Sequence, residues 1–296
     1  MKKTHEKLIS NTIRIAGSSC ILFILLIFFF LMREGLPALA EVSLKDLFSA
    51  RWYPIEGLFG ILPLLSGSLI VTVFSILIAL PLGVGTAIYI GEIAPRRVNE
   101  ILKPTIEILA GIPSVVLGFI GILVLSPFMR QTFNLPTGLT AFTGAFLLAL
   151  ISIPTIVSIA EDALYAVPKT YRDAAYALGA SKWQIIWGVV LPAARTGILT
   201  AVMLGVGRSL GETMAVMMVT GNAPTMFSGL NSFISPIRTM TATIASEMGE
   251  VASGSTHYHV LFFIGIILFV FSLVINVSSS TTLTKRTAKS RAQVVS

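Results

Sequence analysis

Charged residues are scarce in this chain. Only 12% of its 296 residues are Asp, Glu, Lys or Arg, whereas 54% are hydrophobic, and the mean hydropathy is +0.87. This composition excludes a soluble enzyme and predicts an all-α integral membrane protein. Cysteine is almost absent as well. The single Cys20, in the first apolar run, excludes a disulfide framework within the chain.

The common signatures of catalysis and metal binding are missing. The sequence contains no G-x4-G-K-[ST] phosphate loop and no H-E-x-x-H pair. His257 and His259 stand close together, but no third ligand is evident, so we expect interfacial histidines rather than a metal site. We therefore predict no enzyme activity, no catalytic residue, no metal site and no cofactor bound by this chain.

Six long apolar segments are present instead. Each is long enough to cross roughly 30 Å of hydrocarbon as a helix. Proline and glycine in the second and fifth segments predict tilts, kinks or breaks there. The predicted spans lie near residues 14–33, 62–91, 104–128, 138–160, 194–220 and 258–280.

Positive charge is distributed unevenly between the loops. If the N-terminus is cytoplasmic, 15 of the 21 Lys and Arg residues fall in the two termini and in the 92–103 and 161–195 loops. This asymmetry predicts a multi-pass protein of the cell membrane with both termini in the cytoplasm. It also accounts for the net charge of +7 without a nucleic-acid partner. A signal-peptide cleavage site after Ala40 is the alternative, but the uncharged run from Ile15 to Met32 is longer than a usual signal core.

An arginine and a glutamate lie four residues apart within the fifth apolar segment. A charge at the centre of a spanning helix costs about 2.5–3.5 kcal/mol on insertion scales, so a compensating role is expected. The spacing places Arg208 and Glu212 on one helix face, where they can pair. A guanidinium fork fixed in the membrane is suited to receiving an anion. A pair that only joins helices is the structural alternative.

The segment between the fourth and fifth spans has the pattern of two short helices that meet at an elbow. In the first helix, Thr170 with Asp173 resembles a capping box, and Gly179 is typical of the residue just after a helix C-terminus. Ala174 and Ala175 leave this surface thin, so another protein can approach it closely. We expect more than a simple connecting loop here, because long loops usually have a function.

The second helix of the elbow also carries start and stop signals. Ser181 with Gln184 fits the capping box as it is usually written, and Pro192 is expected to end the helix.

The residues of this elbow resemble a motif of the permease subunits of ABC importers. Asp173-Ala-Ala-x3-Gly179-x9-Val189-x-Leu191-Pro192 is similar to E-A-A-x3-G-x9-I-x-L-P, with Asp for Glu and Val for Ile. The resemblance implies the type I importer fold, which is MetI-like, with six transmembrane helices. It also implies that elbow 168–192 couples to a separate ATPase through Asp173, Ala174, Ala175, Gly179, Leu191 and Pro192.

Other segments resemble the phosphate permeases of the PstC type. Gly207-Arg208-Ser-Leu-Gly211-Glu212-Thr213-Met-Ala-Val is similar to their G-R-A-x-G-E-T-M-A-V segment, and Ala110-Gly-Ile-Pro113-Ser114-Val-Val-x-Gly118 to their third-span motif. The Ala245-x-Glu247-x-Gly249-Glu250 segment fits as well. The resemblance implies a substrate pathway formed by Arg208, Glu212, Thr213, Gly211, Pro113 and Ser114.

Within that pathway the expected roles differ. Arg208 offers bidentate donors that stay charged at any pH. Three roles stay open for Glu212: holding Arg208, weakening binding so that phosphate can leave, or donating a hydrogen bond when protonated. Gly205, Gly207 and Gly211 are expected to bring neighbouring backbone close. Pro113 is expected to break or bend the third span, with an ordinary kink as the alternative.

The resemblance also implies an organisation and a set of partners. Residues 1–60 hold the N-terminal tail, first span and outer loop, residues 61–282 the permease domain, and residues 283–296 a basic cytoplasmic tail. The implied partners are a second permease of the PstA type, an ATPase dimer of the PstB type that uses ATP and Mg²⁺, an extracytoplasmic phosphate-binding protein of the PstS type, and membrane lipid. The implied function is import of inorganic phosphate by alternating access.

Three alternative functions follow from the same residues. Within the class, the cargo could be another oxyanion, such as sulfate or molybdate. An ion-coupled carrier with Glu212 as its proton site would leave the elbow unexplained. A membrane subunit that reports phosphate status would be compatible with transport.

Overall fold

The computed structural model describes residues 2–295, and the side chains of these except 2–8, 230–231 and 278–295. Within this part of the chain, six helical segments are long and apolar enough to cross a membrane, as the sequence predicted. Apart from helices, the described residues form one small antiparallel hairpin, in which β1 (Trp52–Tyr53) pairs with β2 (Leu58–Phe59).

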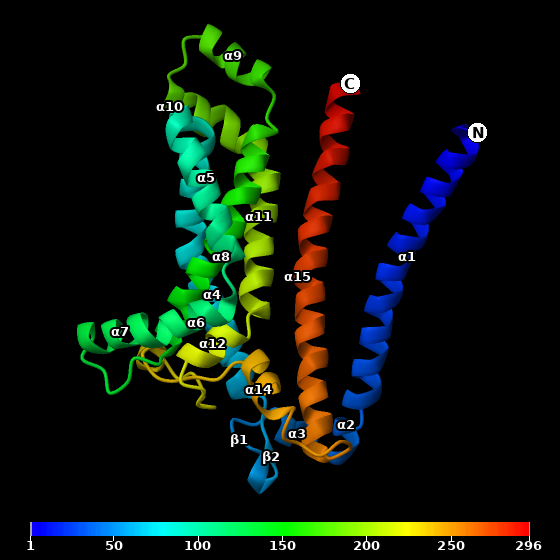
Figure 1. The fold of residues 1–296 in the computed structure, drawn as a ribbon, viewed down its shortest axis with the longest axis vertical. Coiled ribbons are helices and arrows are strands. Elements are labelled where there is room, and N and C mark those ends of the chain that lie inside the picture. The colour runs from blue at the N-terminus through cyan, green and yellow to red at the C-terminus, as the bar shows by residue number, and fades with distance from the viewer. Residues whose placement is uncertain (1, 296) are drawn as a thin grey trace.

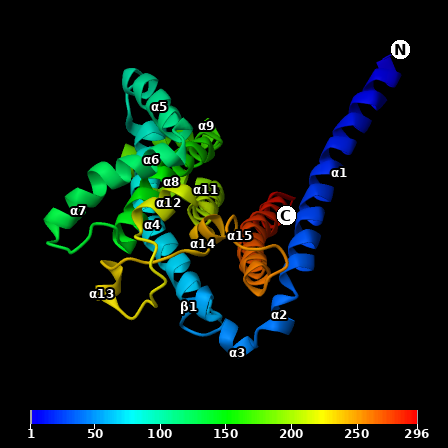
Figure 2. The same cartoon turned by 60° about the horizontal axis from the view of Figure 1, so that its bottom comes forward.

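The first helix stands apart from the main bundle. Figures 1 and 2 show α1 (Lys2–Gly35) diverging from the other spans, with only its lower end against α15 (Thr256–Val295). There Phe28 contacts Phe269 with ring centroids 5.2 Å apart. None of the most apolar stretch of α1 is buried, so this stretch requires lipid or another chain around it. The connection to the next span contains α2 (Ala38–Glu41), α3 (Leu44–Leu47) and the 3₁₀ turn η1 (Pro54–Glu56).

Three spanning helices form the centre of the bundle: α4 (Leu62–Ile88), α8 (Ala141–Tyr165) and α11 (Leu191–Gly211). The middle helix is the most enclosed, with 61% of its apolar window buried. Its fully buried Ile156 fits between two glycines. A Cβ atom on Gly83 of α4 would lie 2.8 Å from the Ile156 side chain, and one on Gly205 of α11 would lie 2.7 Å away. Small residues of this kind let helix backbones approach closely in lipid.

A cluster of three serine hydroxyls joins the same helices. Ser75 Oγ of α4 donates to Ser209 Oγ of α11 at 3.0 Å, and Ser152 Oγ of α8 lies 2.8 Å from that oxygen. All three side chains are buried. Polar contacts of this type contribute about 0.6 kcal/mol each in a membrane protein, so packing dominates and the hydroxyls fix the alignment.

The third span is not one continuous helix, so the helix expected over 104–128 is wrong. The chain leaves the helical conformation at Ile112 and Pro113, where ψ is 127° and 134°. Proline lacks an N–H and disfavours helix in the residue before it, which confirms the predicted break. Figure 1 shows the following helices lying across the lower end of the bundle. The elements are α5 (Arg96–Gly111), α6 (Ser114–Ile120), the π-helical turn η3 (Gly121–Leu125) and α7 (Ser126–Thr132).

The fifth span, predicted over 194–220, is broken as well, because α11 ends at Gly211 and α12 (Met214–Val219) begins three residues later. The far halves of the two broken spans pack together. A Cβ atom on Gly118 of α6 would lie 2.7 Å from the Met218 sulfur and 3.2 Å from the Ala215 Cα, both in α12.

The remaining elements lie at the two ends of the bundle. Figure 1 places both chain ends and α9 at one end, and the hairpin, α12 and α14 at the other. The elements are the π-helical turn η2 (Tyr89–Ile93), α9 (Lys169–Ala177), α10 (Lys182–Ile185), the π-helical turn η4 (Ile186–Val190), α13 (Leu230–Phe233) and α14 (Met240–Glu247).

The glycine packing generates a stability prediction. Substituting Gly83→Val places a branched side chain against Ile156, and we expect a loss of about 1–3 kcal/mol from overpacking. Thermal unfolding of the detergent-solubilised protein measures the effect. Gly85→Val is the matched control, since Gly85 lies on the same helix with no described atom within 4 Å of its Cβ position. Equal unfolding temperatures for the two variants would contradict the packing account.

Candidate functional site

Arg208 lies near the end of α11, with its side chain half-buried against α8. Its Nη1 donates to Thr155 Oγ1 at 3.0 Å. Among the described side chains, no carboxylate forms an ion pair with Arg208. A guanidinium has five N–H donors, so most of the fork is left for another group. Thr155 was not predicted, because its partner is 53 residues away in the sequence.

Glu212 does not pair with Arg208, so the predicted i, i+4 pair is wrong. The reason is the helix break: Glu212 is extended, with φ −70° and ψ 130°, and the face shared by residues four apart is lost. Its carboxylate turns to the next helix, where Oε1 accepts from Ala215 N at 3.4 Å. Its backbone oxygen accepts from Thr241 Oγ1 at 3.0 Å. Glu212 therefore connects the break to α12 and α14.

The other predicted pathway residues are spread around the two breaks. Thr213 Oγ1 donates to Gly211 O at 3.3 Å, across the gap between α11 and α12. Pro113 and Ser114 lie at the break before α6. No hydrogen bond between described residues joins Pro113 or Ser114 to Arg208, so the structure brings Arg208 together with Thr155 rather than with the third-span motif.

An apolar cavity of about 370 Å³ lies beside the break in the fifth span, between α11, α14 and α15. Gly207 and Gly211 line it together with leucine and phenylalanine side chains. A Cβ atom on either glycine would meet no described atom within 4 Å. The prediction of close packing is therefore wrong for Gly207 and Gly211 among the described residues, whereas it is confirmed for Gly205. The lining suits an acyl chain or another helix better than an anion.

The elbow turns at Gly179, as predicted. Gly179 adopts φ +79°, a left-handed conformation that favours glycine. Its N–H donates to Tyr176 O at 2.9 Å, and the Ala180 N–H donates to Ala175 O at 3.1 Å. These two bonds form a Schellman motif, which satisfies the last carbonyls of α9.

The two predicted capping boxes have different outcomes. Ser181 N donates to Gln184 Oε1 at 2.8 Å and Gln184 N donates to Ser181 Oγ at 3.4 Å, which confirms the second box. The box of Thr170 with Asp173 is wrong. The helix already begins after Pro168, which places Thr170 inside the first turn, where its side chain makes no cap.

Pro192 does not end the second elbow helix, which is a further correction. The helix continues from α10 through η4 into α11 as one span, Lys182–Gly211. At the junction the Leu191 N–H donates to Ile186 O, five residues back, and Pro192 follows directly. The wider π turn absorbs the missing N–H of proline, so the helix is not broken.

The elbow presents one face to solvent and one to the bundle. Asp173, Ala174 and Gly179 are exposed, whereas Ala175 packs against the buried core of the bundle. Two large apolar side chains of the elbow are also exposed to solvent: Tyr176 is 52% exposed and Leu178 is 89% exposed. Exposed apolar groups at one end of a membrane bundle are typical of a protein interface.

The bundle end that carries the elbow also holds an ion pair. Lys103 Nζ of α5 lies 2.7 Å from Glu161 Oε1 of α8, whose side chain is buried. The hydrogen bond to Glu161 raises the pKa of Lys103 above its ordinary value, against the opposing effect of burial. The ammonium therefore stays charged at neutral pH and fastens α5 to α8.

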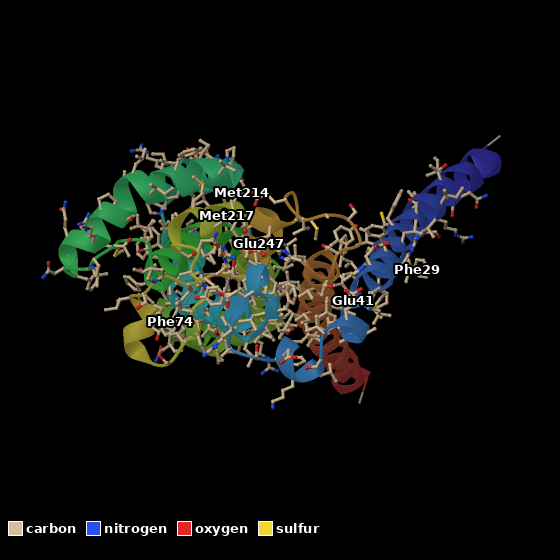
Figure 3. The ribbon with its side chains drawn as sticks, turned by 90° about the horizontal axis from the view of Figure 1, so that it is seen from below. Phe29, Glu41, Phe74, Met214, Met217 and Glu247 are labelled. Atoms are coloured by element: carbon tan, nitrogen blue, oxygen red, sulfur yellow. The ribbon has the colours of Figure 1, made fainter. Side chains whose placement is uncertain are left out.

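At the opposite end, Glu247, which is labelled in Figure 3, has several polar partners. Its carboxylate bonds the Arg238 guanidinium, accepts from Trp52 Nε1 at 3.2 Å and lies 2.9 Å from His257 Nε2. His259 Nδ1 bonds Glu34 O at 2.8 Å. The two histidines thus join the hairpin, α14, α15 and α1, which gives each a structural partner.

The elbow generates a second prediction. Gly179→Ala places a Cβ atom in a left-handed backbone, and we expect a loss of about 1–2 kcal/mol that is local to the elbow. Amide hydrogen exchange of residues 169–190 in the purified protein measures it. Gly188→Ala is the control, because Gly188 lies in the right-handed turn η4, without a positive φ, and has open space at its Cβ position. Exchange that is unchanged by Gly179→Ala would contradict the left-handed turn.

Comparisons with known proteins agree with this architecture. Residues 79–284 match the family described as binding-protein-dependent transport system inner membrane component. The probable ABC transporter permease protein YqgH of Bacillus subtilis is 42% identical over 233 residues, which is 78% of this chain and 74% of that protein. The phosphate transport system permease protein PstC of Mesorhizobium japonicum is 37% identical over 257 residues, which is 80% and 77% of the two chains.

A solved structure confirms the fold. The inward-facing MetNI methionine ABC transporter matches with a TM-score of 0.56 at 21% identity, over 76% of this chain and 94% of that one. This likeness confirms the predicted MetI-like permease fold. The chain belongs to the family of binding-protein-dependent inner membrane transport components, as an ABC permease subunit of the PstC type.

Proposed function

We propose that this chain is the permease subunit of an ATP-driven importer of inorganic phosphate, and that Arg208 receives the anion inside the membrane. Relatives named as phosphate permeases support the cargo, because they align with 80% and 81% of the chain. The observation that carries the site is the half-buried Arg208 guanidinium, which no described carboxylate neutralises.

The chemistry of Arg208 and Thr155 suits an oxyanion. A phosphate group carries about −1.5 to −2 charges near neutral pH and presents several acceptor oxygens. The guanidinium offers planar paired donors to two of them. Thr155 Oγ1 accepts from Arg208, so its own O–H is left to donate to the same anion. Together they form a site made of donors, which selects against cations.

Glu212 acts on the helix that follows the site. Its bond to Ala215 N fastens the start of α12, and its charge, close in sequence to Arg208, keeps the affinity low enough for release. Pro113 and Ser114 break the third span so that α6 can pack on α12. In this proposal, the non-helical backbone at both breaks lines the transport path. A membrane protein tolerates non-helical backbone in such a position.

The remaining parts of the assembly follow from the chain's own surfaces. Elbow 168–192 lies at the same end as both termini, which the distribution of basic residues assigns to the cytoplasm. There Asp173, Ala174 and the turn at Gly179 dock on an ATPase dimer that uses ATP and Mg²⁺, with Leu191 and Pro192 carrying its motion into α11. A second permease covers the exposed apolar faces, and an external phosphate-binding protein delivers the cargo. Binding of ATP opens the spans outward, and hydrolysis returns them inward.

The anion site is tested by removing the charge on Arg208. In the complete complex reconstituted in vesicles, Arg208→Gln should lower ATP-driven phosphate uptake by about 10- to 100-fold, because hydrogen bonds to a charged group are lost. Arg195→Gln is the control, since Arg195 is exposed near the other end of the same helix. Normal uptake by Arg208→Gln would contradict the proposed site. Uptake of sulfate in place of phosphate by the unaltered complex would contradict the cargo.

The docking surface is tested at Ala174, which is exposed, rather than at Ala175, which packs inward. Ala174→Arg should reduce the amount of ATPase that co-purifies with this chain by about tenfold or more, corresponding to roughly 1.4 kcal/mol. Ala174→Ser keeps the surface thin and should leave co-purification unchanged. Full retention of the ATPase by Ala174→Arg would show that it docks elsewhere.

A further inference from the structure

A partly buried arginine fastens the elbow to the spanning helices. Arg172 lies between Tyr171 and Asp173 on α9, and both neighbours are exposed. The Arg172 side chain turns the other way, into the bundle, and is only 19% exposed. Its Nη2 lies 2.6 Å from Glu92 Oε1 and its Nε lies 3.4 Å from Glu92 Oε2, so the guanidinium binds the carboxylate in a bidentate contact.

The same guanidinium also holds the end of α8. Arg172 Nη1 donates to Val167 O at 2.7 Å, and Nη2 donates to Leu164 O at 2.9 Å. Leu164 lies in the last turn of α8 and Val167 just beyond its end, where backbone acceptors lack helical partners and the dipole favours a cation. One side chain therefore joins three elements: α9, α8 and the π-helical turn η2.

The turn η2 continues α4, and it is packed against the same residues of α8. A Cβ atom on Gly91 would lie 3.5 Å from the Leu164 side chain. The π turn itself is supported by Asn99 Nδ2, which donates to Ile90 O at 2.9 Å. Through the contact of Gly91 with Leu164, the ends of α4 and α8 meet at the point where Arg172 binds.

Stability is a poor explanation for this pair. Removing a carboxylate and a guanidinium from water costs several kcal/mol, and apolar residues of similar volume are often as stable or more so. A bidentate fork instead fixes direction and distance, and leaves little freedom to slide. Farther along α8, nine residues or about 14 Å from Leu164, Thr155 contacts Arg208. A displacement imposed on the elbow therefore has a rigid route to the anion site.

We propose that Arg172 and Glu92 form the link that transmits motion of the docked ATPase from the elbow into α4 and α8. Arg172 is a positioning residue, since it acts through the helices and does not touch the cargo. This inference rests on the proposed function for its source of motion, but not for the identity of the cargo.

The test uses the complete complex, purified through a tag on this chain, with Arg172→Gln, Glu92→Gln and the double variant. We expect each single variant to keep its ATPase and to hydrolyse ATP. Phosphate imported per ATP hydrolysed should fall by roughly three- to thirtyfold. The double variant should be no worse than the worse single one, because the pair acts as a unit. The controls are Arg96→Gln and Glu100→Gln, which break an exposed Arg–Glu pair on α5.

A second readout separates this inference from the identity of the cargo. Addition of a non-hydrolysable ATP analogue should change amide hydrogen exchange in both 169–180 and 86–94 of the unaltered complex. In Glu92→Gln, only the elbow segment should respond. A response of 86–94 that survives in Glu92→Gln would overturn the link, and so would loss of the ATPase together with uptake. Phosphate import that fails in the unaltered complex, with the exchange pattern intact, would count against the cargo alone.

Discussion

One turn of α8 determines how the rest of the molecule is arranged. Ser152 bonds the Ser209 hydroxyl, Thr155 accepts from Arg208, and Ile156 fills the space opposite Gly83 and Gly205. These contacts bring α4, α8 and α11 close together and set their alignment. Because lipid provides no hydrophobic drive for helices to associate, close packing of this kind supplies most of the cohesion. The orientation of Arg208 is a consequence of that packing.

From this centre, the two ends of the bundle are built on different principles. At the elbow end, ion pairs of Lys103 with Glu161 and of Arg172 with Glu92 tie the surrounding helices to α8 and α4. At the opposite end, two spans break, and their far halves α6 and α12 pack across the bundle. The first end is suited to transmitting motion as a rigid body, and the second to rearranging backbone around a passing anion.

Local sequence signals predicted the features that depend on a few neighbouring residues. Spans follow from apolar length, the elbow from Gly179, and the third-span break from Pro113. Features that depend on distant partners could not be predicted. Thr155 is 53 residues from Arg208, and Glu92 is 80 residues from Arg172. The expected pair of Arg208 with Glu212 assumed an unbroken helix through both residues, whereas the helix ends at Gly211.

The central claim is that this chain transports phosphate across the membrane in a process driven by ATP hydrolysis. The most direct measurement is radiolabelled phosphate uptake by ATP-loaded, uncoupler-treated cells with and without this chain, with sulfate uptake measured alongside. The account predicts that phosphate uptake is lost without the chain while sulfate uptake is unchanged. Loss of sulfate uptake instead, or phosphate uptake that requires the proton gradient rather than ATP, would contradict it.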